Sequence, residues 1–108
     1  MSLERVGASV LGQGQLAVSA GVIYTVPSST SAEITNITLI NSSTTDSIAI
    51  ILYLKGTSAS NEWARHVLDG HEWTEWTGTL HLRAGETIAG SASTATAITY
   101  TISGNENG

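Results

Sequence analysis

The stretch GVIYTVPSSTSAEITNITLINSSTTDSIAIILYLK, residues 21–55, decides the fold class of this 108-residue chain. Three runs rich in Ile, Val, Thr and Tyr, over 22–26, 32–40 and 48–54, alternate with clusters of Ser, Thr, Pro and Asp. Branched and aromatic side chains suit a pleated, half-buried strand, and the spacer residues favour turns. The stretch therefore predicts three strands joined as a β-meander.

The third run is apolar on both of its faces. Alternate positions form the two faces, with Ile48, Ile50, Leu52 and Leu54 on one and Ala49, Ile51 and Tyr53 on the other. A strand of this kind is typical of the centre of a sheet that is covered twice. We therefore expect Ile51 and Tyr53 to be covered by a partner or by the N-terminal arm.

Short strands are also predicted in the rest of the chain, and no segment has a sustained period of 3.6. They are expected over residues 10–18, 62–68, 71–77, 80–82, 87–93 and 95–103. Asp69-Gly70 predicts a two-residue hairpin turn. A phase change near Thr35-Asn36 predicts either a β-bulge or a strand that is buried on both faces in turn. The pattern indicates an all-β fold, a single antiparallel β-sandwich of the jelly-roll or Greek-key type with about eight strands.

The same pattern divides the chain into three parts. A flexible N-terminal arm over residues 1–8 precedes a sandwich domain over 9–103, and a polar tail follows over 104–108. The N-terminus lacks the apolar core of a signal peptide, and no apolar run approaches the ~20 residues that span a membrane. We expect a protein made in the cytoplasm, with no membrane partner.

Composition excludes several kinds of site. The chain has no Cys, which rules out disulfides, zinc–thiolate sites and cysteine nucleophiles. Only 12% of residues are charged, so the surface is short of the charges that normally prevent association. The net charge of −5, with four scattered basic residues, argues against nucleic acid as a partner.

One segment, residues 63–81, holds all three Trp and all three His of the chain. Exposed Trp63, Trp73 and Trp76 would form a platform for sugar rings, beside Asp69 and Glu75. Alternatively, some of these indoles fill the core and others lie in a subunit interface, where Trp is enriched.

The same segment carries no recognisable catalytic or metal-binding pattern. No HxH or HExxH spacing occurs, and Glu72 and Glu75 have opposite parity on a strand, so they could not flank one glycosidic bond. We therefore predict no catalytic residue, no metal ligand and no cofactor.

Four segments together resemble a known group of proteins. They are VIYTVPSSTSAEI at 22–34, ITLIN at 37–41, ILYL at 51–54 and LRAGETI at 82–88. Their order is similar to that in small β-sandwich virion proteins of tailed bacteriophages, over about residues 21–103. The resemblance implies an oligomer, often a trimer, on the phage particle, as a capsid decoration (cement) protein or a part of the neck, tail or fibres. It transfers no catalytic residue.

These expectations combine into one functional hypothesis. The chain is expected to be a non-enzymatic virion structural protein, a homotrimer that docks on a major capsid, neck or tail protein, most simply as a capsid decoration protein. Its predicted binding and interface residues are Leu3, Val6, Ile51, Tyr53, Trp63, Trp73 and Trp76. The alternative is a tail-fibre receptor-binding or carbohydrate-binding module that holds a surface glycan with the Trp-rich segment.

Overall fold

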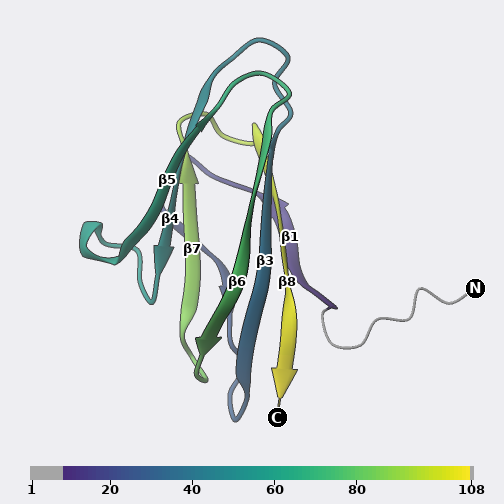
Figure 1. Ribbon diagram of the computed structural model, residues 1–108. Helices are drawn as coiled ribbons and strands as arrows, with labels where there is room; N and C mark the ends of the chain where they lie inside the picture. The colour runs from purple at the N-terminus through teal and green to yellow at the C-terminus, as the bar shows by residue number, and fades with distance from the viewer. Residues whose placement is uncertain (1–8, 108) are drawn as a thin grey trace, which may run out of the picture.

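The computed structural model describes residues 9–107, and within them eight strands form two four-stranded antiparallel sheets packed face to face (Figure 1). The strands are β1 (Ser9–Gln15), β2 (Gly21–Thr25), β3 (Ser31–Asn41), β4 (Ile48–Leu54), β5 (Glu62–Leu68), β6 (Trp73–Leu82), β7 (Thr87–Ala92) and β8 (Ile98–Asn107). A short 3₁₀ helix, η1 (Ala59–Asn61), precedes β5. The predicted antiparallel β-sandwich is confirmed. The predicted N-terminal arm, with Leu3 and Val6, lies outside the described residues.

Strand order identifies the sandwich as a jelly roll. Sheet A has the order β1-β8-β3-β6, and sheet B has the order β2-β7-β4-β5. The strands therefore pair from the two ends of the chain inward: β1 with β8, β2 with β7, β3 with β6 and β4 with β5. This is the pairing of a long antiparallel ribbon that folds over into two layers, as in a jelly roll. The chain changes sheet at every connection except the one between β4 and β5.

The predicted meander is wrong, although its three strands exist. β2 and β4 lie in sheet B, whereas β3 lies in sheet A between β6 and β8. The polar spacers that follow β2 and β3 cross from one layer to the other instead of turning back within a sheet. Turn-forming residues reverse the chain in either case, so composition alone did not distinguish the two topologies.

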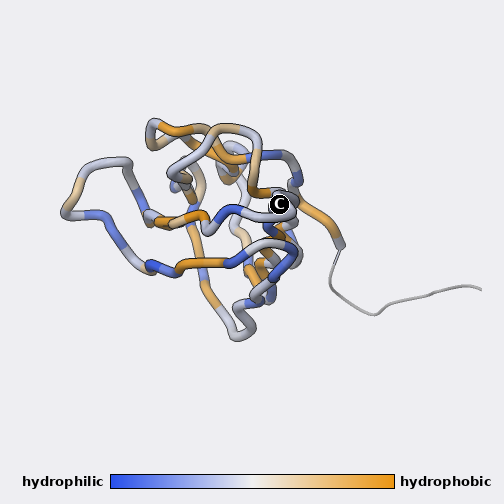
Figure 2. Tube along the Cα trace, turned by 90° about the horizontal axis from the view of Figure 1, so that it is seen from above, coloured by the Kyte–Doolittle hydropathy of each residue, from blue (hydrophilic) through white to orange (hydrophobic). Residues whose placement is uncertain are grey.

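The inner faces of both sheets form the core. Sheet A contributes Ile34, Ile37 and Ile102, which are fully buried, and sheet B contributes Ile48 and Ile50. Viewed from above, short hydrophobic and hydrophilic segments alternate along the chain (Figure 2). The change of phase in β3 is a bulge between Ile34 and Asn36, one of the two predicted alternatives, and it keeps both Ile34 and Ile37 in the core.

The turn at Asp69 differs from the predicted hairpin. β5 and β6 belong to different sheets, and the turn closes with a 2.9 Å hydrogen bond from the Glu72 N–H to the Asp69 carbonyl. Its central residues are Gly70 and His71, and His71 has the positive φ of 63°. Gly70 is needed for space, because a Cβ there would lie 2.6 Å from the Thr44 carbonyl oxygen.

Two other boundaries differ from the sequence expectation. β6 continues through Gly78, where the sequence predicts a break. β8 continues to Asn107, whereas the sequence predicts a polar tail from Gly104. The end of β8 is a strand because it pairs with β3, with Gly104 opposite Ile34 and Glu106 opposite Ala32.

A hydrogen bond between the sheets secures the end of β8. The buried Tyr24 hydroxyl on β2 donates to Glu106 Oε2 at 2.5 Å. Burial, and then the hydrogen bond and charge of Glu106, raise the pKa of the Tyr24 phenol well above its ordinary value of 10.0. Because the neutral phenol is preferred in the folded state, this contribution to stability is present below about pH 10 and is lost as the pH rises above it.

Substitution of Tyr24 by Phe tests this contact. We expect Tyr24→Phe to lower the free energy of unfolding by about 1 kcal/mol at neutral pH and to reduce the loss of stability in alkali. The measurement is urea unfolding at about pH 8 and about pH 11. Tyr100→Phe is the matched control, because Tyr100 is equally buried and its hydroxyl makes no hydrogen bond within residues 9–107. Equal effects of the two substitutions would contradict the assignment.

Candidate functional site

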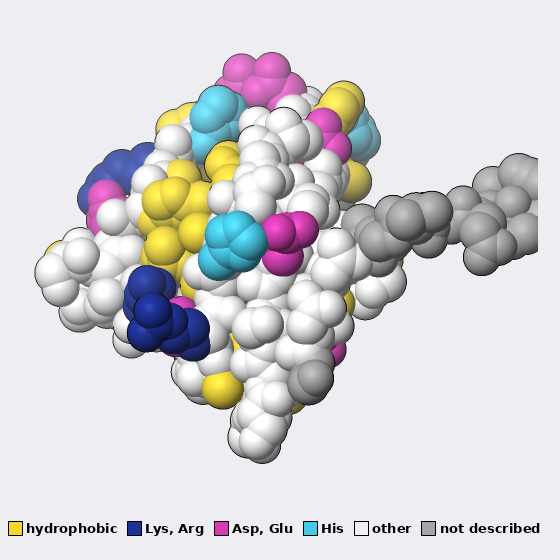
Figure 3. All heavy atoms as spheres, turned by 60° about the horizontal axis from the view of Figure 1, so that its bottom comes forward, with side chains coloured by type: hydrophobic (Ala, Val, Ile, Leu, Met, Phe, Trp, Pro, Cys, Tyr) yellow, Lys and Arg dark blue, Asp and Glu magenta, His cyan; other side chains and the backbone are white. Residues whose placement is uncertain are grey.

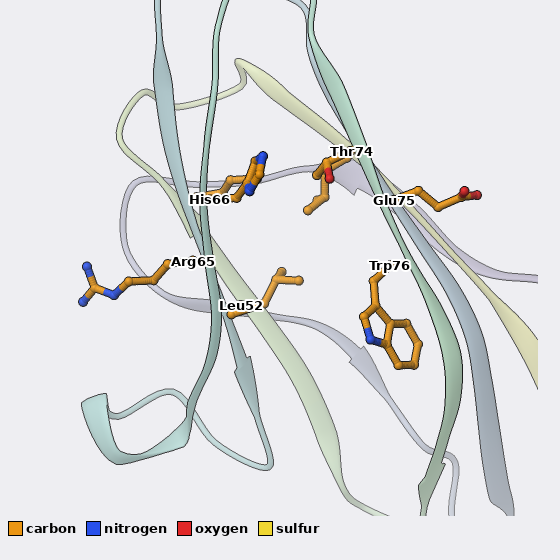
Figure 4. A pocket seen from close by; sticks show the side chains of 9 residues that line it. Leu52, Arg65, His66, Thr74, Glu75 and Trp76 are labelled. Atoms are coloured by element: carbon orange, nitrogen blue, oxygen red, sulfur yellow. The ribbon is translucent and has the colours of Figure 1, made fainter.

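The sandwich is closed along one side and open along the other. Edge strands β1 and β2 lie close together although they belong to different sheets, whereas edge strands β5 and β6 lie farther apart. A cavity of about 160 Å³ opens between β5 and β6 over a floor that includes Leu39, Ile50 and Leu52. Figure 4 shows Leu52 and Trp76 pointing into this gap. The hydrophobic core therefore reaches solvent along this open edge.

Two tryptophans bridge part of the open edge. Trp63 comes from β5 and Trp76 from β6, and their ring centroids lie 5.3 Å apart with an interplanar angle of 73°. This edge-to-face arrangement is favourable for aromatic rings. Trp63 lies at a bulge, where the register shifts between Leu52 and Tyr53 of β4. Both indoles are half-buried and pack on the core, so their contact connects the two sheets across the gap.

Further core side chains remain partly exposed at the same edge. Leu54, at the end of β4, and Leu80, on β6, pack against the core but keep part of their surface in solvent. Figure 3 shows hydrophobic side chains gathered in a patch that lies between two groups of Lys and Arg side chains. A patch of this kind is typical of a surface that contacts another protein.

The outer face of sheet B continues this apolar surface around β5. Ile51 is half-exposed opposite Arg65, and Val67, which is 58% exposed, lies opposite Ala49. Ile51 and Tyr53 both face outward from β4, and the strand is central in its sheet, as predicted. Tyr53 is only 9% exposed within a single subunit, so it offers little surface to a partner.

We call Ile51, Leu54, Trp63, Val67, Trp76 and Leu80 the open-edge surface. Two ion pairs lie near it. Arg65 forms a bidentate ion pair with Glu62 on β5, and this contact, more than the charge alone, holds the pKa of the Glu62 carboxyl below its usual range. Lys55 lies 3.5 Å from Glu86, whose pKa is lowered first by the Arg83 backbone N–H and then by Lys55. Paired charges leave little repulsion to oppose association.

The three tryptophans do not form one platform. On β6, Trp76 shares the inner face with its partner Ile37, whereas Trp73 lies opposite Ile40 on the outer face. Residues three apart on a strand face opposite ways, so Trp73 cannot join the other two indoles. Trp73 is 63% exposed. The predicted sugar platform of three tryptophans is therefore wrong, and Trp73 alone remains open.

Sequence reasoning missed two polar groups at the mouth of the gap. Figure 4 shows the His66 ring on β5 directed toward Thr74 on β6, while Arg65 and Glu75 point away. The period-2 pattern places His66 on the same side as Leu68, but it does not reveal that the sheets part there. His81 lies elsewhere, on the outer face of sheet A, with its Nε2 3.7 Å from Glu33.

Across residues 9–107, no three His, Asp or Glu side chains lie close enough together to hold a metal ion. No helix in this part of the chain is long and apolar enough to cross a membrane. No family model matches this chain, and no curated protein resembles it closely enough to count as a match.

Proposed function

We propose that this protein is a non-enzymatic structural protein of a bacteriophage particle, which self-associates through the open-edge surface and docks on other particle proteins. The observation that carries the proposal is the exposure of core side chains at the gap between β5 and β6. A small domain that leaves Trp63, Trp76 and Leu80 partly in solvent loses stabilisation that a neighbouring subunit would restore.

Three further features support self-association. β5 is an edge strand, so its outward N–H and C=O groups are available to pair with a strand of another copy. Val67 extends the apolar surface beyond the gap. Only 12% of the residues are charged, and the ion pairs beside the open-edge surface neutralise part of that charge. These features fit a contact between subunits better than a solvated surface.

The phage assignment comes from the resemblance of residues 21–103 to virion proteins. In that setting we propose a homotrimer, made in the host bacterial cytoplasm and incorporated in the virion, most simply as a capsid decoration protein on the major capsid protein. A position on the neck, tail or fibre would use the same surface. In a trimer, each subunit contacts the next through two different patches of its surface, and the ring closes after three copies.

Substitution of Val67 by Lys tests the role of the open-edge surface. We expect Val67→Lys to weaken self-association at least about a hundredfold, since an unpaired charge buried in an interface costs several kcal/mol. The measurement is sedimentation over a range of micromolar concentrations, with thermal unfolding as a check on the fold.

Val10→Lys is the matched control for that experiment. Val10 is 54% exposed on edge strand β1, at the far side of the sandwich, so the same change should leave the oligomer intact. Equal weakening by both substitutions would assign the effect to net charge and contradict the proposed surface.

A further inference from the structure

The outer face of sheet A differs in character from the apolar outer face of sheet B. Strand register places mostly hydroxyl and amide side chains on it: Gln13 and Gln15 from β1, Asn36 and Thr38 from β3, Thr77 from β6, and Thr99, Thr101 and Ser103 from β8. The face carries few charges. It therefore offers many hydrogen-bonding groups.

Trp73 stands out on this polar face. Its side chain is 63% exposed, the largest fraction among the exposed large hydrophobic residues of the described chain. Ile40, directly opposite on β3, is itself 44% exposed and faces Thr99 on its other side. Together, Trp73 and Ile40 present an open apolar plate that is bordered by hydroxyl groups.

A connected polar network lies beside this plate. The Thr38 hydroxyl donates to Asn36 Oδ1 at 2.9 Å, and the Asn36 amide donates in turn to Glu75 Oε2. Glu75 pairs with Thr38 across the strands and is two residues from Trp73, so it lies roughly 7 Å along the strand from the indole. Figure 4 shows the Glu75 side chain directed away from the gap, and its Oε1 accepts no hydrogen bond within residues 9–107.

These groups match the chemistry of a sugar ring. One face of a pyranose carries C–H groups that pack on an indole, and the ring edge carries hydroxyls that donate to a carboxylate and accept from an amide. The network holds Glu75 in place before any ligand arrives, which reduces the entropic cost of binding. We propose that Trp73, with Glu75, Asn36 and Thr38, binds a residue of a neutral oligosaccharide.

The site is independent of the proposed assembly role. It lies on the outer face of sheet A, whereas the open-edge surface comprises the gap between the sheets and the outer face of sheet B. β6 forms one wall of the gap, but Trp73 faces away from it, so a contact made with the side chains of the open-edge surface leaves the indole exposed. Either proposal can therefore fail while the other stands.

Isothermal titration calorimetry with neutral hexasaccharides tests the site. The panel is maltohexaose, cellohexaose, mannohexaose and xylohexaose, at up to millimolar concentrations. We expect saturable binding of at least one member, and we expect Trp73→Ala to weaken it at least about tenfold and Glu75→Gln to weaken it severalfold. Because Trp73 is mostly exposed, Trp73→Ala should keep the thermal unfolding midpoint of the parent protein.

Val18→Ser is the matched control, because it removes a comparably exposed hydrophobic side chain from the connection between β1 and β2, outside both proposed surfaces. It should leave sugar binding unchanged. Absence of saturable binding to every member of the panel would overturn the proposal, as would binding that persists in Trp73→Ala. A loss of self-association in Trp73→Ala without any sugar binding would also overturn it, because the face would then contact a second copy of the chain.

Discussion

Replacing Asn41 by Ala is expected to lower the free energy of unfolding by about 4 kcal/mol. Asn41 is fully buried at the end of β3. Its amide nitrogen donates to the carbonyls of Asp46, Leu68 and Asp69 at 2.8, 2.9 and 3.1 Å, and its Oδ1 accepts from the Ser43 N–H at 2.9 Å. Alanine would remove all four bonds. The Asp69 carbonyl keeps the Glu72 N–H, but within residues 9–107 the Asp46 carbonyl and the Ser43 N–H lose their partner, and each buried polar group left unpaired costs about 1–3 kcal/mol.

Urea unfolding measures this effect, with Asn36→Ala as the control. Asn36 lies on the same strand and is partly exposed, so we expect its removal to cost less than about 1 kcal/mol. Asn41 connects the loop after β3 to the turn between β5 and β6. Removing its side chain should therefore also make this loop and this turn more mobile. Equal costs for the two substitutions would mean that Asn41 does not organise these loops.

Replacing Gly104 by Ala is expected to cost about 3 kcal/mol. Gly104 lies in β8 opposite Ile34, beside the bulge of β3. A Cβ at this position would collide with the carbonyl oxygen of Glu33 and lie 3.0 Å from the Ile34 Cα. Both of these atoms belong to the backbone of β3, which is paired on each side and cannot easily shift. The clash is therefore removed only if the end of β8 moves away from β3.

Gly12→Ala is the control for that substitution, with thermal and urea unfolding as the measurements. Gly12 lies in β1 of the same sheet, and a Cβ there would have an ordinary 3.5 Å contact with the Ile23 carbonyl oxygen. We expect a change within about 0.5 kcal/mol. An unaltered stability in Gly104→Ala would show that β8 can detach beyond Ser103 without cost, as the polar tail predicted from sequence would allow.

The positions of many strands could be predicted from the sequence, because a strand shows itself in the alternation of apolar and polar residues that are neighbours in the chain. The limits of β4 and β5 agree with the sequence, and the bulge of β3 follows from its change of phase. The pairing of β3 with β6 and β8 could not be predicted in this way. It depends on which strands meet across the core, and period-2 alternation is the same for every partner.

The candidate site could be predicted only in part, because its shape also depends on which strands lie next to one another. Trp63 and Trp76 were expected to be interface residues, which stays a prediction. The alternation of side chains along a strand could have shown that Trp73 and Trp76 lie on opposite faces. The gap beside His66 arises because β5 and β6 end different sheets, which is a property of the topology alone. The buried state of Tyr53 likewise depends on its neighbours in β5 and β7.

Hydrogen exchange at β5 tests the central claim, that the open-edge surface is covered by a second copy. The amides of β5 that face away from β4 have no strand partner within residues 9–107. We predict that they exchange slowly at concentrations where the oligomer forms and quickly after dilution or in Val67→Lys, while the amides of β8 exchange slowly throughout. Fast exchange of the outward β5 amides at every concentration, in a protein that sediments as a monomer and does not bind capsids, would contradict the account.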